Sequence, residues 1–318
     1  MLRRLSPLLA LLALLALPAT APAAKVNVAV GIGDQSARMF ADPNYRALGL
    51  KKTRYFIHWD AVTKPDELKK ADDFVAAANA AGVRVLMHLS SNNLTARQAK
   101  LPSLALYTAA AQALIERYRP MGVREWGVWN EVNHDTQPTF RSPKRAAQFF
   151  KAFRGLCSGC RIVALDVLDQ KGVESYIKKW FAAAGSAGRR SAKVVGIHNY
   201  SQVNRRITEK KASDRYPGTA RIIKAIRKKN RVAKFWYTET GGVVNFGGSL
   251  PCNRSRAANR TKFMFDLLKT YDKDVERLYS YNWYGADCNG FDAGLVERNG
   301  TPRPAYAAFK RGLRNARR

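Results

Sequence analysis

The chain of 318 residues carries 55 Lys and Arg against 24 Asp and Glu, which gives a formal net charge of +31. Its four cysteines form one CxxC and lack the second CxxC of a zinc site, and its four histidines show no paired spacing. No segment after the N-terminal leader is long and apolar enough to span a membrane. These features exclude a structural zinc protein and a membrane-inserted protein, and we expect no metal or other cofactor.

The first 23 residues have the pattern of a secretory signal peptide. Two arginines precede the apolar run Leu8–Leu17, and small residues follow up to Ala23, where we place the cleavage. The apolar run is too short to cross a bilayer, which takes about 20 residues. We therefore expect residues 24–318 to be secreted, extracellular or associated with the cell wall, and to act as a monomer.

From residue 26 onward, β-prone runs alternate with helical patterns. The expected strands are Val26–Ile32, Thr53–Ile57, Arg84–His88, Val123–Asn133, Arg161–Val167, Lys193–Ile197, 234–242 and Arg277–Trp283. Helical patterns fall near 45–48, 65–82, 104–118, 142–154, 173–184, 219–229, 256–271 and 305–313. Strict alternation indicates parallel strands with right-handed crossovers, and eight units predict an α/β fold with a single (β/α)₈ barrel over residues 24–318. The alternative is a doubly wound open sheet, but the first strand lacks the GxGxxG turn.

Two of these strands end in a carboxylate. The run VREWGVWNEVN delivers Asn130 and Glu131, and the run KFWYTETGG delivers Glu239 before it breaks at two glycines. Because an unpaired charge is costly to bury, and because strand ends of a barrel share one face, we expect these groups to meet there. One carboxyl group that protonates a leaving oxygen and one that attacks carbon or activates water are the requirements of glycoside hydrolysis.

Other polar and aromatic side chains follow the expected strands, and we expect them to bind substrate: Arg54, His88, Asn130, His198, Tyr200 and Trp283. Each candidate has a structural alternative. Glu131 and Glu239 could form ion pairs at the barrel rim, and His88 and His198 could be hydrogen-bonded core histidines. Trp283 could pack at the barrel end instead of offering a flat face to a sugar.

Together these residues resemble the clan A glycoside hydrolases, in which catalytic glutamates follow strands 4 and 7. Asn130-Glu131 and Glu239 carry the resemblance, and His198-Asn199-Tyr200 is similar to the His-x-Tyr of family 5. Arg54 followed by Trp59, and Trp283, are also similar to family 5 residues. Arg54 continues with Tyr55-Phe56 where family 5 has Arg-x-Pro, so a family 39-like protein is an equal alternative.

The resemblance implies retaining hydrolysis of a β-glycosidic bond by double displacement. Glu131 would act as acid and then base, and Glu239 as the nucleophile. Arg54 and Tyr200 would hold Glu239, and Asn130 would bind the 2-hydroxyl of the sugar. We also expect the charge of Glu239 to keep Glu131 protonated.

The four cysteines suit disulfides in an exported protein. We expect a small structural loop closed by Cys157 and Cys160, and a second pair, Cys252 with Cys288, in the loops after the seventh and eighth strands.

The high positive charge leaves further alternatives open. It can be a solvated basic surface, or it can attract an anionic cell-wall polymer or another polyanion. No nucleic-acid recognition motif accompanies the basic clusters, so we expect no specific nucleic-acid partner. The alternatives to a glycosidase are a non-catalytic carbohydrate-binding or wall-binding barrel, and a polyanion-binding exported protein. The sequence indicates neither the sugar nor the linkage.

Overall fold

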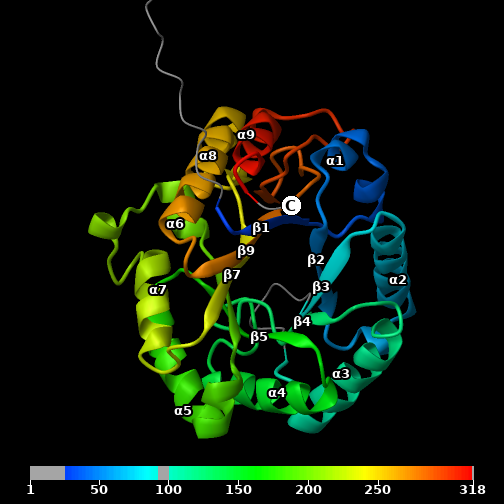
Figure 1. The fold of residues 1–318 in the computed structure, drawn as a ribbon, viewed down its shortest axis with the longest axis vertical. Helices are drawn as coiled ribbons and strands as arrows, with labels where there is room; N and C mark the ends of the chain where they lie inside the picture. The colour runs from blue at the N-terminus through cyan, green and yellow to red at the C-terminus, as the bar shows by residue number, and fades with distance from the viewer. Residues whose placement is uncertain (1–25, 92–99, 317–318) are drawn as a thin grey trace, which may run out of the picture.

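The computed structural model describes residues 26–91 and 100–316, so the predicted signal peptide lies outside the described residues. Within them, eight parallel strands close into a barrel in chain order, with helices around it (Figure 1). The strands are β1 (Ala29–Gly33), β2 (Lys52–His58), β3 (Arg84–Ser90), β4 (Glu125–Gly127), β5 (Arg161–Leu168), β6 (Val194–His198), β7 (Lys234–Thr240) and β9 (Val275–Tyr281). The predicted (β/α)₈ barrel is confirmed.

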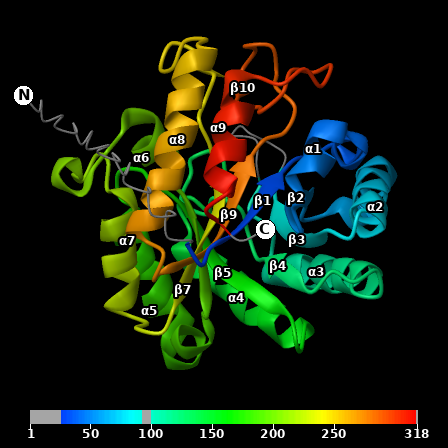
Figure 2. The ribbon, with the colours of Figure 1, turned by 45° about the horizontal axis from the view of Figure 1, so that its top comes forward.

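The helices cover the outside of the barrel, as the tilted view in Figure 2 also shows. They are α1 (Pro43–Leu48), α2 (Pro65–Ala80), α3 (Leu104–Tyr118), α4 (Pro143–Leu156), α5 (Val173–Ser191), α6 (Tyr200–Arg205), α7 (Gly218–Arg227), α8 (Arg254–Thr270) and α9 (Pro304–Leu313). Short 3₁₀ helices span Ala37–Ala41, Ala61–Thr63 and Glu209–Lys211. Local sequence explains several helix starts: proline occupies the first turn of α1, α2, α4 and α9. Among the described residues, no helix has the length and apolarity that a membrane crossing requires.

The interior of the barrel is packed at the end where its strands begin. A cluster of buried side chains from β3, β5, β6, β7 and β9 fills this end: Leu86, Val163, Val194, Trp236 and Tyr279. Below it, the guanidinium of Arg277 lies 3.8 Å from the ring centroid of Trp236 and donates a 2.6 Å hydrogen bond to Glu125. The packed layer closes this end of the barrel, and active sites in such barrels lie at the opposite, carboxyl end of the strands.

Three local features differ from the expected pattern at the strand ends. β4 ends at Gly127, and the chain turns before Glu131, whose φ of 45° is left-handed. Tyr200 starts helix α6 and therefore does not continue the strand β6. The eighth barrel strand, β9, ends at Tyr281, two residues before Trp283.

A two-stranded antiparallel sheet of β8 (Asn245–Phe246) and β10 (Phe291–Asp292) lies outside the barrel. These short strands pair across 45 residues or more of sequence and carry no local β pattern.

Both expected cysteine pairs are brought together. Cys157 and Cys160 close the short loop between α4 and β5. Cys252 and Cys288 connect the loop that follows β8 to the loop that precedes β10. The second bridge therefore joins the two segments that carry the extra sheet.

Replacement of Arg277 by Ala will leave the Glu125 carboxylate without its ion-pair partner. The side chains of Arg277 and Glu125 are 7% and 12% exposed, and a buried ion pair that loses one partner costs about 3–5 kcal/mol of unfolding free energy. Denaturant unfolding measures this loss. The matched control is Arg117→Ala, because Arg117 pairs with Asp72 at 46% and 29% exposure and such surface pairs contribute below about 1 kcal/mol. Equal losses in the two variants would contradict the prediction.

Candidate active site

The two carboxylates singled out in the sequence converge at the carboxyl ends of the strands. Glu239 is the penultimate residue of β7, and Glu131 lies in the turn after β4. Both face the same imidazole nitrogen: His198 Nδ1 lies 2.8 Å from Glu131 Oε1 and 3.9 Å from Glu239 Oε2. The two oxygens are therefore no farther apart than the sum of these distances.

Glu239 is held by two further side chains. Arg54 Nη1 donates a 2.7 Å hydrogen bond to one carboxylate oxygen, and the Tyr200 hydroxyl donates a 2.9 Å bond to the other. Arg54 also donates to Asn130 Oδ1 at 2.5 Å and lies 3.3 Å from His88 Nδ1. The Arg54 side chain is 1% exposed, whereas Glu239 is 11% exposed. The Arg54 guanidinium is therefore buried beneath the site, whereas the Glu239 carboxylate is partly exposed to solvent.

A third carboxylate, which the sequence reading missed, lies beneath the first two. Asp166 on β5 has no exposed surface, and its Oδ2 lies 2.9 Å from His198 Nε2 and 3.6 Å from His88 Nε2. The hydroxyl of Thr238 donates to Asp166 Oδ1, and the backbone N–H of Glu131 lies 3.4 Å from Oδ2. In the sequence, Asp166 is the one acidic residue inside the apolar run RIVALDVL, and this was the only feature that could have indicated a buried functional carboxylate.

Two glycines leave room for this buried layer. A Cβ on Gly127 would lie 2.1 Å from the His88 ring, and a Cβ on Gly196 would lie 1.8 Å from Asp166 Oδ1. Any larger residue at either position would displace the polar side chain beside it. The strands β4 and β6 therefore accommodate the charged groups through residues that have no side chain.

Opposite charges set the protonation of this layer. Burial lowers the pKa of His198, but the Asp166 and Glu239 charges outweigh burial and raise the pKa to about 10. Burial raises the pKa of Asp166, but the charge of His198 outweighs burial and holds the pKa well below its ordinary value. Burial dominates at His88 and lowers the pKa to about 3. At neutral pH the site thus holds an imidazolium at His198 and a neutral ring at His88.

The positive charge of His198 also lowers the pKa of Glu131, which we expected to be raised by the charge of Glu239. Burial raises the pKa of Glu131, as would a neighbouring carboxylate, but the hydrogen bond and charge of His198 outweigh burial and lower the pKa. The prediction that Glu239 keeps Glu131 protonated left out this cation. His198 is fully buried, so it acts on the carboxylates and is not placed to touch a substrate.

The aromatic residues of the site also differ from the expected set. Trp283 is completely buried, donates its indole N–H to Asp42 at 3.0 Å and packs against Tyr45 and Tyr306, so its ring offers no face to a sugar. Partly exposed rings are instead grouped around Tyr200, whose hydroxyl donates to Glu239. Phe291 of β10 has its centroid 5.3 Å from that of Tyr200 and 6.2 Å from that of Tyr281.

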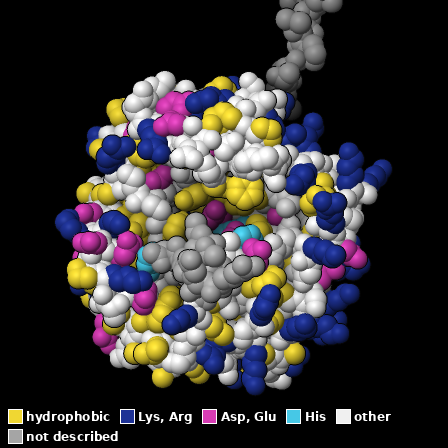
Figure 3. Space-filling view, turned by 180° about the vertical axis from the view of Figure 1, so that it is seen from behind, with side chains coloured by type: hydrophobic (Ala, Val, Ile, Leu, Met, Phe, Trp, Pro, Cys, Tyr) yellow, Lys and Arg dark blue, Asp and Glu magenta, His cyan; other side chains and the backbone are white. Residues whose placement is uncertain are grey.

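Figure 3 shows the face opposite to that in Figure 1, where acidic and histidine side chains lie in a central hollow. Hydrophobic side chains border the hollow, and Lys and Arg side chains are spread around the rim of the face. Within residues 26–91 and 100–316, no group of three or more His, Cys, Asp or Glu side chains could hold a metal ion. The site therefore offers carboxylates, cations and aromatic rings for its chemistry.

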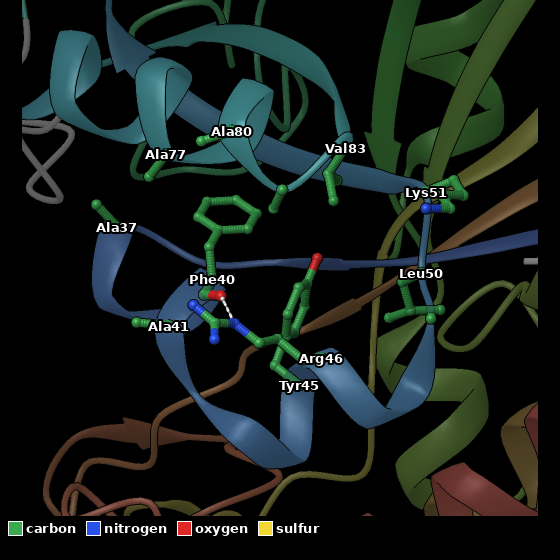
Figure 4. Close-up of a pocket in the computed structure, with 12 residues that line it drawn as sticks. Ala37, Phe40, Ala41, Tyr45, Arg46, Leu50, Lys51, Ala77, Ala80 and Val83 are labelled. Carbon is green, nitrogen blue, oxygen red and sulfur yellow. Dashed lines mark hydrogen bonds between the residues drawn. The ribbon is translucent and has the colours of Figure 1, made fainter.

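A separate pocket of about 460 Å³ lies on the outer wall of the barrel, between α1 and α2. Figure 4 shows Phe40, Tyr45 and Leu50 facing Ala77, Ala80 and Val83 across it. Arg46 donates to the carbonyl of Phe40 at 2.9 Å, and neither Glu131 nor Glu239 lines this space. It offers an apolar surface without a pair of acid and base groups, and we place the candidate active site at the strand ends.

No protein-family model and no curated protein matches the chain. Solved structures do resemble it. A structure of fungal β-1,4-galactanases gives a TM-score of 0.62 at 11% identity, with 90% of this chain and 99% of that chain covered. A psychrophilic family 10 endo-β-1,4-xylanase gives 0.60 at 16% identity (89% and 96% covered), and xylanase B from Clostridium stercorarium F9 gives 0.56 at 16% (89% and 96%).

At identities this low, the structural similarity shows that the chain shares the barrel fold with these enzymes and shows nothing more. The family named for one of them is family 10, so the family 5-like or family 39-like assignment stays a prediction.

The raised pKa of His198 makes a prediction about stability and pH. His198 binds its proton more tightly in the folded chain, where its pKa is about 10, than in the unfolded chain, where it is 6.5. Its stabilising contribution is therefore complete below pH 6.5 and is lost as the pH rises toward 10. We expect His198→Gln to be less stable than wild type by several kcal/mol at pH 6, since one pKa unit corresponds to about 1.4 kcal/mol, and this difference to shrink toward pH 10. Urea unfolding at pH 6, 8 and 10 tests this, and a constant difference would refute it.

Proposed function

We propose that this chain is a secreted, retaining glycoside hydrolase that cleaves β-glycosidic bonds of a polysaccharide or oligosaccharide. The observation that carries the proposal is the convergence of Glu131 and Glu239 on one nitrogen of His198 at the carboxyl end of the barrel. Retaining enzymes place their carboxyl groups about 5–5.5 Å apart, and inverting enzymes about 6.5–9.5 Å apart. The upper limit set by the two His198 distances includes the retaining spacing and excludes all but the lowest end of the inverting range.

In the first step, Glu239 attacks the anomeric carbon while Glu131 gives its proton to the leaving oxygen. The glycosidic bond breaks, and an ester bond forms between the sugar and Glu239. In the second step, Glu131 takes a proton from water, the oxygen of that water attacks the anomeric carbon, and Glu239 leaves as a carboxylate. Arg54 and Tyr200 keep Glu239 oriented for both steps, and Asn130, which accepts a hydrogen bond from Arg54, would bind the sugar hydroxyl beside the reacting carbon.

The backbone of Glu131 supports a functional role. A non-glycine residue with φ of 45° costs on the order of 1–3 kcal/mol, and such strain persists where the surroundings fix it, often at active sites. The proposed reacting groups are also the exposed ones: the side chains of Glu131 and Glu239 are 18% and 11% exposed, against 0% for His198 and Asp166. This gradient fits groups that meet a substrate above groups that hold them.

The proposed substrate is a β-linked carbohydrate, and the similar structures are described as xylanases and galactanases. The chain would act as a monomer, outside the cell or at the cell wall, without a cofactor. Its net charge of +31 gives a reason to include anionic wall polymers among the substrates.

Trapping of the covalent intermediate tests the function. A panel of 2-deoxy-2-fluoro β-glycosides, including xylosides and galactosides, will add the mass of one fluorosugar to the intact wild-type protein. Glu239→Gln will show no gain, because an amide does not form the ester. Glu131→Gln is the matched control, since it retains the nucleophile and still forms the adduct from sugars with leaving groups that need no proton. A folded wild-type protein that gains no mass with any sugar would favour the non-catalytic carbohydrate-binding alternative.

The charge preference has its own test. If anionic polymers are the natural substrates, their hydrolysis will fall steeply when NaCl is raised from 50 to 500 mM, because salt screens charges beyond a few ångströms. Hydrolysis of neutral xylan or galactan, compared under the same conditions, will change little. Equal salt responses for both kinds of polymer would remove the anionic preference and leave the catalytic proposal intact.

A further inference from the structure

The proposed reaction moves a negative charge from one carboxylate to another. Before the first step Glu239 is ionised and Glu131 holds the proton; after it, Glu239 is an ester and Glu131 carries the charge. His198 Nδ1 faces both groups, at 3.9 Å and 2.8 Å. Arg54, the other cation of the site, contacts Glu239 at 2.7 Å and no oxygen of Glu131 among the contacts of the described residues.

A cationic histidine with no exposed surface requires a buried counter-charge, because an unpaired buried ion is strongly destabilising. Asp166 Oδ2, at 2.9 Å from His198 Nε2, lies on the opposite side of the ring from the two glutamates. The Asp166 carboxylate is itself fixed by the hydroxyl of Thr238 and by the backbone N–H of Glu131. It therefore contacts both the imidazole and the strained backbone of the acid/base candidate.

We propose, on the basis of the function above, that Asp166 is a positioning residue of this site. Its carboxylate keeps His198 as an imidazolium between Glu131 and Glu239, so that one positive charge faces whichever glutamate is ionised during turnover. The sequence motifs that identified Glu131 and Glu239 do not include an acidic residue on β5, and the proposed reaction of these two glutamates does not itself call for one.

The charged and titratable groups around the imidazole come from five strands or their ends. Glu131 after β4, Asp166 of β5 and Glu239 of β7 contact the ring. Arg54 of β2 and His88 of β3 lie one contact further away, because Arg54 contacts Glu239 and His88 contacts Asp166. Of the groups that raise the pKa of His198, Asp166 contributes most, followed by Glu239 and then by the hydrogen bond to Glu131. Loss of the Asp166 charge therefore removes the main reason for the ring to stay protonated.

The first test reads the charge of His198 directly and needs no substrate. The chain has only four histidines, so their ¹⁵N imidazole signals can be assigned with His58→Gln, His88→Gln and His134→Gln. In the wild type at pH 7 we expect both nitrogens of His198 to be protonated. In Asp166→Asn the ring will lose its proton at a clearly lower pH. A neutral His198 in the wild type, or an unchanged titration in Asp166→Asn, would overturn the proposal.

Two control variants separate Asp166 from its neighbours. Asp169 follows the same strand and is also fully buried, but it accepts hydrogen bonds from the backbone N–H groups of Ser201 and Gln202, at 2.9 and 2.6 Å. Asp169→Asn should leave the His198 titration unchanged. Glu131→Gln should also leave His198 charged at pH 7, and this result supports the proposal even if Asp166→Asn fails to fold. A neutral His198 in Glu131→Gln would make Glu131 the counter-charge and overturn the assignment of Asp166.

The second test measures turnover on the glycoside identified by trapping. The His198 cation lowers the pKa of Glu131 more than the Asp166 charge raises it, so a neutral ring in Asp166→Asn will raise the pKa of Glu131. The basic limb of kcat/KM against pH should then move to higher pH, with a reduced kcat because the imidazolium no longer compensates the migrating charge. A neutral ring with an unchanged profile would refute the role in turnover. If no glycoside reacts with the wild type, the catalytic proposal fails, and the NMR result alone still decides whether Asp166 holds His198 charged.

Discussion

Pairing of opposite charges at the carboxyl end of the barrel is the constraint on which the site depends. Arg54, Glu239, His198 and Asp166 form a chain of alternating sign, and each link is shorter than 4 Å. Charges buried in a medium of low polarity are stable only in such contacts, and removal of one member exposes the others to the full cost of burial. Asp166, His198 and Glu239 lie on the neighbouring strands β5, β6 and β7, whereas Arg54 lies on β2 and reaches Glu239 only when the barrel has closed.

The two ends of the barrel use the same ion-pair chemistry to different effect. At the end where the strands begin, Arg277 is satisfied by Glu125 and by the face of Trp236, and the pair is packed under a layer of apolar side chains. At the other end the lower groups are fully buried, but the upper carboxylates keep exposed oxygens. A closed pair contributes stability alone, whereas a partly open one leaves charged atoms available for a reaction.

The sequence predicted what depends on regular patterns. Alternating strands and helices indicated the barrel, and strand ends brought Glu131 and Glu239 to one face. Details that depend on contacts between distant residues were not predictable. Asp166 lies inside a strand, and only the barrel brings the histidines of two other strands against it. The eighth strand ends two residues earlier than its aromatic run indicated, which buries Trp283 and leaves Tyr281 near the carboxylates. The β8–β10 sheet is held by pairing between distant segments and by the Cys252–Cys288 bridge.

A cation beside the acid/base candidate has opposite effects in the two halves of the proposed cycle. It weakens the hold of Glu131 on its proton, which favours transfer to the leaving oxygen once the substrate is bound but leaves fewer protonated molecules before binding. It then stabilises the carboxylate that must accept a proton from water. Because Glu239 loses its charge as Glu131 gains one, the number of negative charges around His198 stays the same through the first step. A fixed imidazolium between the two groups therefore reduces the reorganisation that charge transfer would otherwise demand in a buried site.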